Sequence, residues 1–301
     1  MLPFSAMLHS EAQAPRRVVP AGSSSLSLLR QAITDVVSRR RLIRYLVQAD
    51  MKKRGSDTFL GNLWWILDPL LQMLVYVIFI YAIGRKTSND YPLFIFAALL
   101  PWKWFIAAIN DATTSVIRQG NLIKGIAFPK LVLPVATATA GTVGFLWGMV
   151  PLGGLMLIYH DRISLMLLWI PVIAGVQYVF TLAGAVFVSA ANVFFRDLGN
   201  AITHLLRLWW FLSPGLFSLA ALSEIDFVKH HPIILTIASL NPFATLFAAY
   251  RNVIYGTPDG VGKPLPPDLT ALAGLLLGSL VFLALTVIFF KRVEPNFAKV
   301  L

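Results

Sequence analysis

Residues 269–290 read LTALAGLLLGSLVFLALTVIFF, a stretch that contains no charged side chain and ends at Lys291 and Arg292. The hydrocarbon core of a bilayer is about 30 Å thick, and roughly 20 consecutive apolar residues in a helix cross it. Basic residues directly after such a run are typical of a helix that leaves the bilayer at a headgroup surface. The stretch therefore predicts a transmembrane helix.

Further apolar runs, bounded by charged residues or by Gly and Pro, predict five more spans. They cover residues 59–83, 91–109, 131–158, 165–195 and 201–222. The 301-residue chain is 57% hydrophobic and 13% charged, whereas soluble globular proteins average about 25% charged residues. The sequence thus predicts an all-α membrane protein with six transmembrane helices.

Basic residues outnumber acidic ones, 25 to 14, and give a net charge of +11. Most of them lie before residue 55, between the second and third predicted spans, near the start of the fifth span and after the sixth. Because Lys and Arg are retained in the cytoplasm, this distribution predicts a multi-pass protein of the cytoplasmic (inner) membrane with both termini cytoplasmic. On such a chain positive charge indicates a membrane surface, and we expect no nucleic acid.

The segment before the first span divides in two. Residues 1–25 are rich in proline, arginine and serine and predict a disordered cytoplasmic tail without the h-region of a signal peptide. Residues 26–54 place apolar side chains at helical spacing between basic ones, which predicts an amphipathic helix in the membrane interface. A plain basic anchor that fixes the topology is the alternative. The basic positions of this helix are Arg39, Arg40, Arg41, Arg44, Lys52, Lys53 and Arg54.

Residues 223–268 form the longest stretch between predicted spans, on the outer side. Their apolar middle part, 233–255, is interrupted at Asn241 and Pro242, and the residue before a proline is disfavoured in a helix. The fifth span is likewise interrupted, at residues 213–215. We expect two short re-entrant helices in the outer leaflet before the last span, because irregular backbone at membrane depth must be covered by protein or water. A single helix on the outer surface is the alternative.

The chain has no cysteine, no G-x-x-x-x-G-K-[ST] phosphate loop and no H-E-x-x-H motif. Thiolate catalysis is excluded, and neither a P-loop nucleotide site nor a metal site is expected. We therefore do not expect an enzyme.

Charged and aromatic side chains inside the predicted spans are the candidates for function. Asp68 lies in the first span, and Lys103 lies between Trp102 and Trp104 in the second. Charges in a bilayer are costly and indicate function by default. Helix capping by Asp68 and snorkelling of Lys103 are the structural alternatives. Tryptophans such as Trp64 either form belts at the membrane interface or stack on sugar rings, and both uses fit the sequence.

Several short motifs follow one another in a fixed order over residues 40–295. They are LIRYLVQAD (42–50), LGNLWWILDPL (60–70), NLIK (121–124) followed by FP (128–129), FFRDL (194–198), SP (213–214), NPF (241–243) and YR (250–251). In this order, on six predicted spans, the chain resembles the transmembrane subunit of ABC-2 type exporters, in the polysaccharide branch that exports O-antigen, capsule or teichoic acid. Asp68 departs from the Asn that is common before this proline.

The resemblance implies the transmembrane subunit of an ATP-driven exporter that moves a polysaccharide linked to polyprenyl pyrophosphate. It implies a homodimer that works with two ABC nucleotide-binding subunits, which would bind ATP and Mg²⁺, while this chain would need no cofactor. Residues 26–54 would be a gate helix whose basic side chains attract the diphosphate. Residues 55–295 would form the six-span domain, and 296–301 a cytoplasmic tail. An ABC-2 permease for a lipid or drug, a membrane-embedded polyprenyl-phosphate transferase and an ion-coupled transporter are the alternatives.

The resemblance also assigns individual residues. Contact with the ATPase is implied for a coupling helix at 119–128 and for the turn between spans four and five, through Gln119, Leu122, Lys124, Phe128, Arg196 and Asp197. The channel and gate candidates are Trp64, Asp68, Trp102, Lys103, Trp104, Asn241, Pro242, Tyr250 and Arg251.

Overall fold

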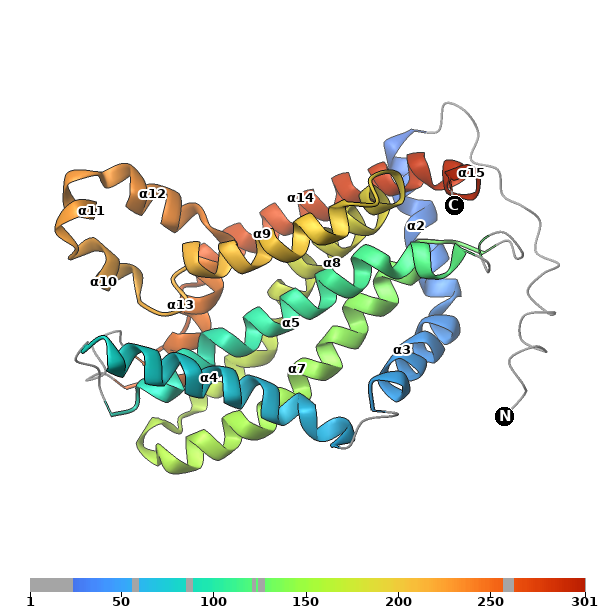
Figure 1. Cartoon of the computed structure of the whole chain (residues 1–301). Coiled ribbons are helices and arrows are strands. Elements are labelled where there is room, and N and C mark those ends of the chain that lie inside the picture. The colour runs from blue at the N-terminus through green and yellow to red at the C-terminus, as the bar shows by residue number, and fades with distance from the viewer. Residues whose placement is uncertain are drawn as a thin grey trace.

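The computed structural model describes residues 24–55, 60–84, 89–120, 123, 128–256 and 263–300. Within these residues every regular element is a helix. The long helices run roughly side by side, as Figure 1 shows, with α2, α3 and α15 at one end and α10, α11 and α12 at the other. We call these the α2/α15 end and the α10–α12 end.

Five helical segments are long and apolar enough to cross a bilayer. Four are α4 (Trp64–Ala82), α5 (Tyr91–Arg118), α7 (Val132–Ile158) and α14 (Leu269–Val293). The fifth joins the short helix η3 (Leu165–Trp169) to α8 (Ile170–Phe194). These segments coincide with five of the predicted spans, so the all-α membrane fold class is confirmed for them.

The C-terminal span shows how local sequence sets the ends of a helix. At its start, the Asp268 carboxylate accepts hydrogen bonds from the backbone N–H groups of Thr270 (2.9 Å) and Ala271 (3.1 Å). Such a cap satisfies donors that have no partner within the helix. At its end, Lys291 and Arg292 lie in the last turn, where cations complement the helix dipole.

The structure does not confirm the sixth predicted span, over 201–222. The helix α9 (Leu198–Leu212) has 15 residues, about 22 Å at 1.5 Å per residue, which is shorter than the hydrocarbon core. It ends because Ser213, next to Pro214, adopts an extended conformation (φ −96°, ψ 152°). A short helix, α10 (Leu219–Ser223), follows.

The region before the last span is divided at the predicted position. After α11 (Asp226–His230), the helices α12 (Pro232–Leu240) and α13 (Pro242–Ile254) meet at Asn241 with a bend of 75°. Together they are long and apolar enough for one broken span or for a re-entrant loop. The re-entrant placement in the outer leaflet stays a prediction.

The helix α5 forms the centre of the bundle and packs against α4, α7, α8, α9 and α13. Trp102 on α5 is 1% exposed and lies against Phe243 of α13, with ring centroids 4.6 Å apart, and against Trp210 of α9, at 5.6 Å. Aromatic rings at such separations add to the burial of apolar area. This aromatic core holds α5, α9 and α13 together.

The predicted amphipathic helix over 26–54 is two helices, α2 (Ser25–Ser38) and α3 (Arg40–Gly55), with the break at Arg39. Near the break, the Ser38 hydroxyl donates to the carbonyl oxygen of Asp35 (3.2 Å), a bond that competes with the helical pattern of the backbone. The helix α2 packs against α14, and α3 packs against α7. Of the predicted disordered tail over 1–25, residues 1–23 lie outside the described residues.

Candidate functional site

One face of α4 carries polar side chains at a spacing of four residues. Asp68, Gln72 and Tyr76 lie above one another on this face, and the Gln72 Nε2 atom donates to the Tyr76 hydroxyl at 3.0 Å. From α5, the Lys103 ammonium donates to the Asp68 carboxylate and to the Gln72 Oε1 atom, the latter at 2.9 Å. The predicted channel candidates Asp68 and Lys103 are therefore an ion pair that joins α4 to α5.

The polar face continues from α5 onto α9. Asn110 lies seven residues after Lys103, so both side chains are on the same face of α5, and the Thr203 hydroxyl of α9 donates to the Asn110 Oδ1 atom at 3.4 Å. At the other end of the face, the rings of Tyr76 and Trp210 stack, with centroids 5.7 Å apart. We call Asp68, Gln72, Tyr76, Lys103, Asn110 and Thr203 the polar wall.

The ion pair in the polar wall is partly open. The Asp68 side chain is 60% exposed and that of Lys103 is 25% exposed. Both residues lie within helices that are long and apolar enough to cross a bilayer. Charged side chains at membrane depth face the interior of a bundle or water rather than lipid. The polar wall is therefore the face of the chain that requires water or another protein surface against it.

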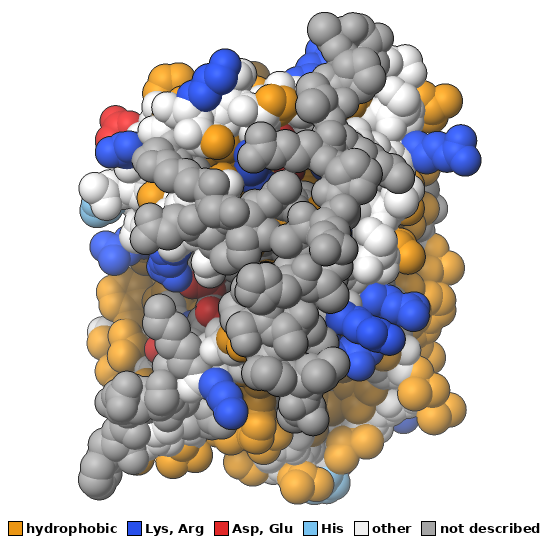
Figure 2. Space-filling model, turned by 90° about the vertical axis from the view of Figure 1, so that its right-hand side faces the viewer, with side chains coloured by type: hydrophobic (Ala, Val, Ile, Leu, Met, Phe, Trp, Pro, Cys, Tyr) orange, Lys and Arg blue, Asp and Glu red, His pale blue; other side chains and the backbone are white. Residues whose placement is uncertain are grey.

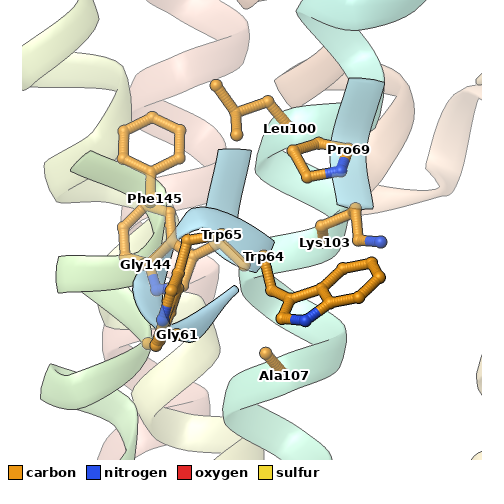
Figure 3. Close-up of a pocket in the computed structure, with 11 residues that line it drawn as sticks. Gly61, Trp64, Trp65, Pro69, Leu100, Lys103, Ala107, Gly144 and Phe145 are labelled. Atoms are coloured by element: carbon orange, nitrogen blue, oxygen red, sulfur yellow. The ribbon is translucent and has the colours of Figure 1, made fainter. Parts of the chain in front are cut away.

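A cavity of about 290 Å³ opens beside the ion pair, between α4, α5 and α7. Figure 3 shows its lining, which includes Trp64, Trp65, Lys103, Gly144 and Phe145. The ring of Trp65 lies directly against Gly144 of α7, where any side chain would collide with it. The predicted candidates Trp64, Lys103 and Trp104 thus line one cavity.

Three further channel and gate candidates, Asn241, Pro242 and Tyr250, lie on α13 or at its start. Asn241 accepts hydrogen bonds from the Phe243 backbone N–H (3.0 Å) and the Trp209 indole N–H (3.2 Å), and donates to the Ser213 hydroxyl (2.7 Å). Pro242 is the first residue of α13. Tyr250 is fully buried. With Trp102 in the aromatic core, the structure brings none of these four into the polar wall.

Arg251 of α13 is 5% exposed and lies with its guanidinium 3.7 Å from the centroid of the Phe94 ring. It donates hydrogen bonds to the carbonyl oxygens of Pro214 (2.6 Å), Phe217 (3.1 Å) and Gly215. These carbonyls belong to the turn that ends α9. Arg251 therefore fastens α13 to this turn, a role that the sequence did not indicate.

The basic residues of the N-terminal helices lie at the α2/α15 end. Arg40, Arg41, Arg44 and Lys52 are exposed on α3, while the side chains of Lys53 and Arg54 lie outside the described residues. Apolar residues between them, Ile43 and Leu46, pack against the body of the protein. Figure 2, which views this end, shows Lys and Arg side chains spread over it with few acidic ones. The arrangement matches a helix that presents cations to a charged surface.

The predicted coupling residues gather at the same end where they are described. Gln119 directly follows the last residue of α5, and Phe128 packs against an apolar cluster that includes Ala32 of α2. Arg196 and Asp197 are exposed in the turn between α8 and α9. Leu122 and Lys124 lie outside the described residues. The end of α5, the start of α7 and the turn between α8 and α9 thus all lie at the α2/α15 end (Figure 1).

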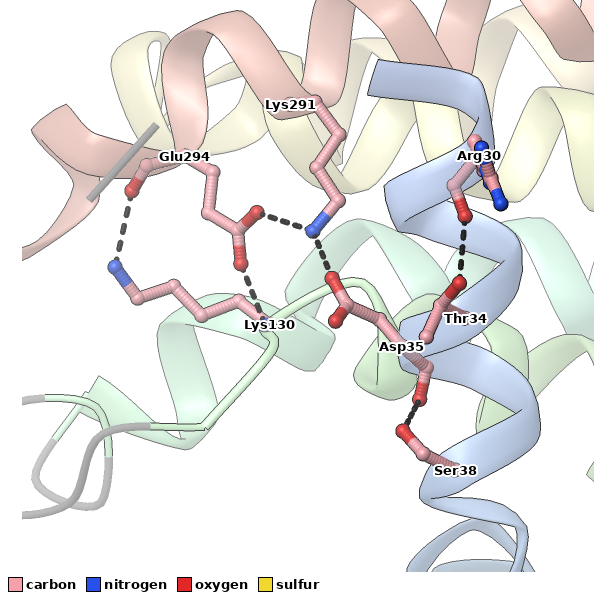
Figure 4. Close-up of polar contacts among 7 residues, drawn as sticks. All are labelled: Arg30, Thr34, Asp35, Ser38, Lys130, Lys291 and Glu294. Carbon is pink, nitrogen blue, oxygen red and sulfur yellow. Dashed lines mark hydrogen bonds and ion pairs between the residues drawn. The ribbon is translucent and has the colours of Figure 1, made fainter. Parts of the chain in front are cut away.

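Two polar networks, which join distant segments, contain residues that the sequence did not single out as functional candidates. At the α2/α15 end, Asp35, Lys130, Lys291 and Glu294 form the network that Figure 4 shows. At the α10–α12 end, Arg162 forms an ion pair with Asp90 (2.6 Å) and donates to the carbonyl oxygen of Tyr255 (2.9 Å). Except for the pair Lys291 and Glu294, which are three residues apart, these networks join residues that are far apart in the sequence, so no local pattern indicates them.

Within the described residues, the helical bundle with its long apolar helices defines a multi-pass membrane protein. No family model matches the chain. It is 29% identical over 267 residues to the O-antigen export system permease protein RfbA of Myxococcus xanthus, an alignment that covers 89% of this chain and 98% of that protein.

Two proteins of the same name from Klebsiella pneumoniae are each 28% identical to this chain. One alignment extends over 261 residues, 86% of this chain and 95% of that protein, and the other over 213 residues, 70% and 79%. These similarities support an ABC-2 polysaccharide export permease, and a transport subunit rather than an enzyme.

Proposed function

We propose that the chain is the transmembrane subunit of an ATP-driven ABC exporter that moves a polysaccharide linked to polyprenyl pyrophosphate across the cytoplasmic membrane. The observation that carries the proposal is the polar wall, because a hydroxyl-rich polymer crosses a bilayer only along a polar surface. The end-to-end similarity to proteins named as O-antigen export permeases supports it. The alternatives of a lipid or drug permease, or of a transferase, have no comparable support.

The polar wall needs a partner surface. An exposed ion pair at membrane depth is costly in contact with hydrocarbon. A second copy of the chain, related by a twofold axis, would place two polar walls opposite each other and enclose a path. Trp64, whose side chain is 46% exposed, lies at the edge of the cavity, where its ring can stack on the apolar face of a sugar. Lys103, Asp68 and Gln72 would then hydrogen-bond to hydroxyl groups.

The α2/α15 end would face the cytoplasm, with both termini there. The exposed Arg residues of α3 would hold the diphosphate of the lipid carrier, since a guanidinium contacts two phosphate oxygens at once. The segment 119–128 and the turn at Arg196 and Asp197 would contact two ABC nucleotide-binding subunits, which bind ATP and Mg²⁺. ATP binding and hydrolysis there would drive the movement.

Deletion of the gene in its native host tests the function. We expect surface polysaccharide to disappear and lipid-linked polymer to accumulate inside the cell, and both effects to be reversed by a plasmid-borne copy. A copy with Lys103→Met and Asp68→Leu, which removes the charges from the polar wall, should reach the membrane without restoring export. Unchanged surface polysaccharide after deletion contradicts the proposal.

A further inference from the structure

We propose that Glu294 and Lys291 are positioning residues that couple the helix α2 to the backbone at Lys130, directly after the segment expected to contact the ATPase. The inference deepens the proposed function, because it assigns the connection through which a movement of that segment reaches the basic helices α2 and α3. It rests on four residues, Asp35, Lys130, Lys291 and Glu294, which we call the ionic cluster (Figure 4).

The ionic cluster joins three segments that are far apart in the sequence. The Lys291 ammonium of α14 contacts the Asp35 carboxylate of α2 at 2.6 Å and the Glu294 carboxylate at 2.9 Å. The other carboxylate oxygen of Glu294 accepts the backbone N–H of Lys130 at 2.7 Å. In return, the Lys130 ammonium donates to the Glu294 backbone oxygen at 2.9 Å. A continuous chain of charged hydrogen bonds thus runs from α2 to the turn before α7.

The cluster is buried and balanced in charge. The side chain of Lys291 is 2% exposed, and those of Asp35 and Glu294 are 16% and 13% exposed. The Lys291 ammonium lies between the Asp35 and Glu294 carboxylates, and the Lys130 ammonium is bonded to the backbone oxygen of Glu294. Removal of one carboxylate therefore leaves part of the buried positive charge of Lys291 uncompensated. Charge-assisted bonds of this kind are shorter and stronger than neutral ones. A substitution of one residue of the ionic cluster should therefore weaken the hydrogen bonds of the other residues.

The polar neighbours of Asp35 on α2 make hydrogen bonds only within the helix. The hydroxyl of Thr34 donates to the Arg30 carbonyl oxygen (2.9 Å), and that of Ser38 donates to the Asp35 carbonyl oxygen (3.2 Å), so both bonds stay within the helix. Other contacts of α2 with the body are made by the buried apolar residues Leu28 and Ala32 and by the uncharged Ser25 hydroxyl, which accepts a hydrogen bond from Arg292 at 3.5 Å. Asp35 is thus the position at which a charge on α2 is tied to the rest of the cluster.

The test is hydrogen exchange at individual amides of the full chain in lipid nanodiscs. Asp35→Asn should speed the exchange of the Lys130 amide roughly tenfold, although residue 35 does not touch that amide, because weakening one charged bond unbalances Lys291 and Glu294. Asp35→Glu keeps the carboxylate and should restore slow exchange. Thr34→Val, one residue away, should leave the Lys130 amide unchanged. An effect of Asp35→Asn confined to α2 overturns the inference.

A second variant tests the coupling from Glu294 to α2. It also provides an independent test if Asp35→Asn does not fold. Glu294→Gln keeps an acceptor oxygen for the Lys130 amide but removes the charge beside Lys291, so amides over residues 28–36 should exchange faster. No change in these amides contradicts the coupling. Both measurements use the chain alone, so they stand or fall independently of the export function.

In the complex with the ATPase, trapping with ATP and vanadate should alter exchange in α2 of the wild-type chain. Glu294→Gln should abolish this response and lower the amount of polymer exported per ATP, while ATP hydrolysis continues. A wild-type response in the Glu294→Gln complex overturns the coupling. Absence of any complex with an ATPase would instead count against the proposed function, and the exchange data on the chain alone would still decide the coupling.

Discussion

A methyl group at Gly144 on α7 would lie 2.1 Å from a ring carbon of Trp65 on α4. The absence of a side chain at residue 144 is therefore what allows the start of α4 to lie against α7. This contact forms one wall of the cavity that also holds Trp64 and Lys103. A substitution at Gly144 therefore tests whether α4 packs against α7 in this way.

We predict that Gly144→Ala destabilises the protein by about 1–3 kcal/mol, because the indole of Trp65 must move out of a filled site. The matched control is Gly153→Ala on the same helix, since nothing lies within 4 Å of a methyl group placed there. The free energy of unfolding, measured by denaturant titration in mixed micelles, should be lowered only by the change at residue 144. Equal losses for the two variants would argue against the contact.

We also predict that the polar wall is accessible to water. The native chain has no cysteine, so single cysteines can be placed without background. Gln72→Cys should react with a small water-soluble thiol reagent in native membranes, because Gln72 shares its face of α4 with Asp68 and contacts Lys103 of α5. Leu74→Cys is the control, since Leu74 is 49% exposed but lies on the apolar side of α4. Faster reaction at residue 74 than at residue 72 would show that the polar face is not the wet one.

The predicted orientation gives a third expectation. A cysteine at Asp161, which is 89% exposed in the turn between α7 and α8, should be labelled from outside by an impermeant reagent in spheroplasts. A cysteine at Ala298, exposed on α15 (Phe297–Val300) at the opposite end, should be labelled only after the membrane is opened. Labelling of Ala298→Cys in sealed spheroplasts would reverse the orientation that we propose.

The basic face of α3 leads to a fourth prediction. If Arg40, Arg41 and Arg44 hold a diphosphate, replacement by Lys keeps the charge but loses the two-pronged contact. Each lost charge-assisted bond costs about 1.5–3 kcal/mol, which corresponds to tenfold or more in affinity for the carrier. Stimulation of ATP hydrolysis by lipid-linked substrate should therefore need more substrate in the Lys variants. Full activity in Lys and Ala variants alike, with normal membrane insertion, would reduce the helix to a topological anchor.

Composition and hydrophobic runs were sufficient to predict five spans, because the need to cover the backbone in lipid imposes a length and a polarity that a single sequence reveals. They placed an interruption at residues 213–215 but still counted the apolar run over 201–222 as a span. In the structure α9 ends at this interruption, because Ser213 before Pro214 adopts an extended conformation, and the helix is too short to cross a bilayer. Hydrophobicity alone therefore overestimated the length of this helix.

Side-chain roles were harder to predict than spans. Trp102 and Trp104 are two residues apart, yet Trp102 lies in the aromatic core and Trp104 lines the cavity. Both side chains are buried, but helical rotation separates them by about 200°, and a local motif does not say which neighbours each one meets. Lys291 marked the end of a span, but its partner Asp35 is 256 residues away. Contacts at such separation depend on tertiary packing.

The hydrogen bonds that Arg251 donates to the turn after α9 show how a helix can end where little water reaches its last carbonyl groups. The last carbonyl groups of a helix normally turn to water, which the hydrocarbon core does not supply. Here the Ser213 hydroxyl donates to the Trp209 carbonyl oxygen at 2.7 Å, and the guanidinium of Arg251 covers the carbonyls that follow. The Arg251 side chain thus supplies the hydrogen-bond donors that water would otherwise provide. A shift of α13 away from α9 would leave these carbonyl oxygens without their donor, so we expect α9 and α13 to move as one unit.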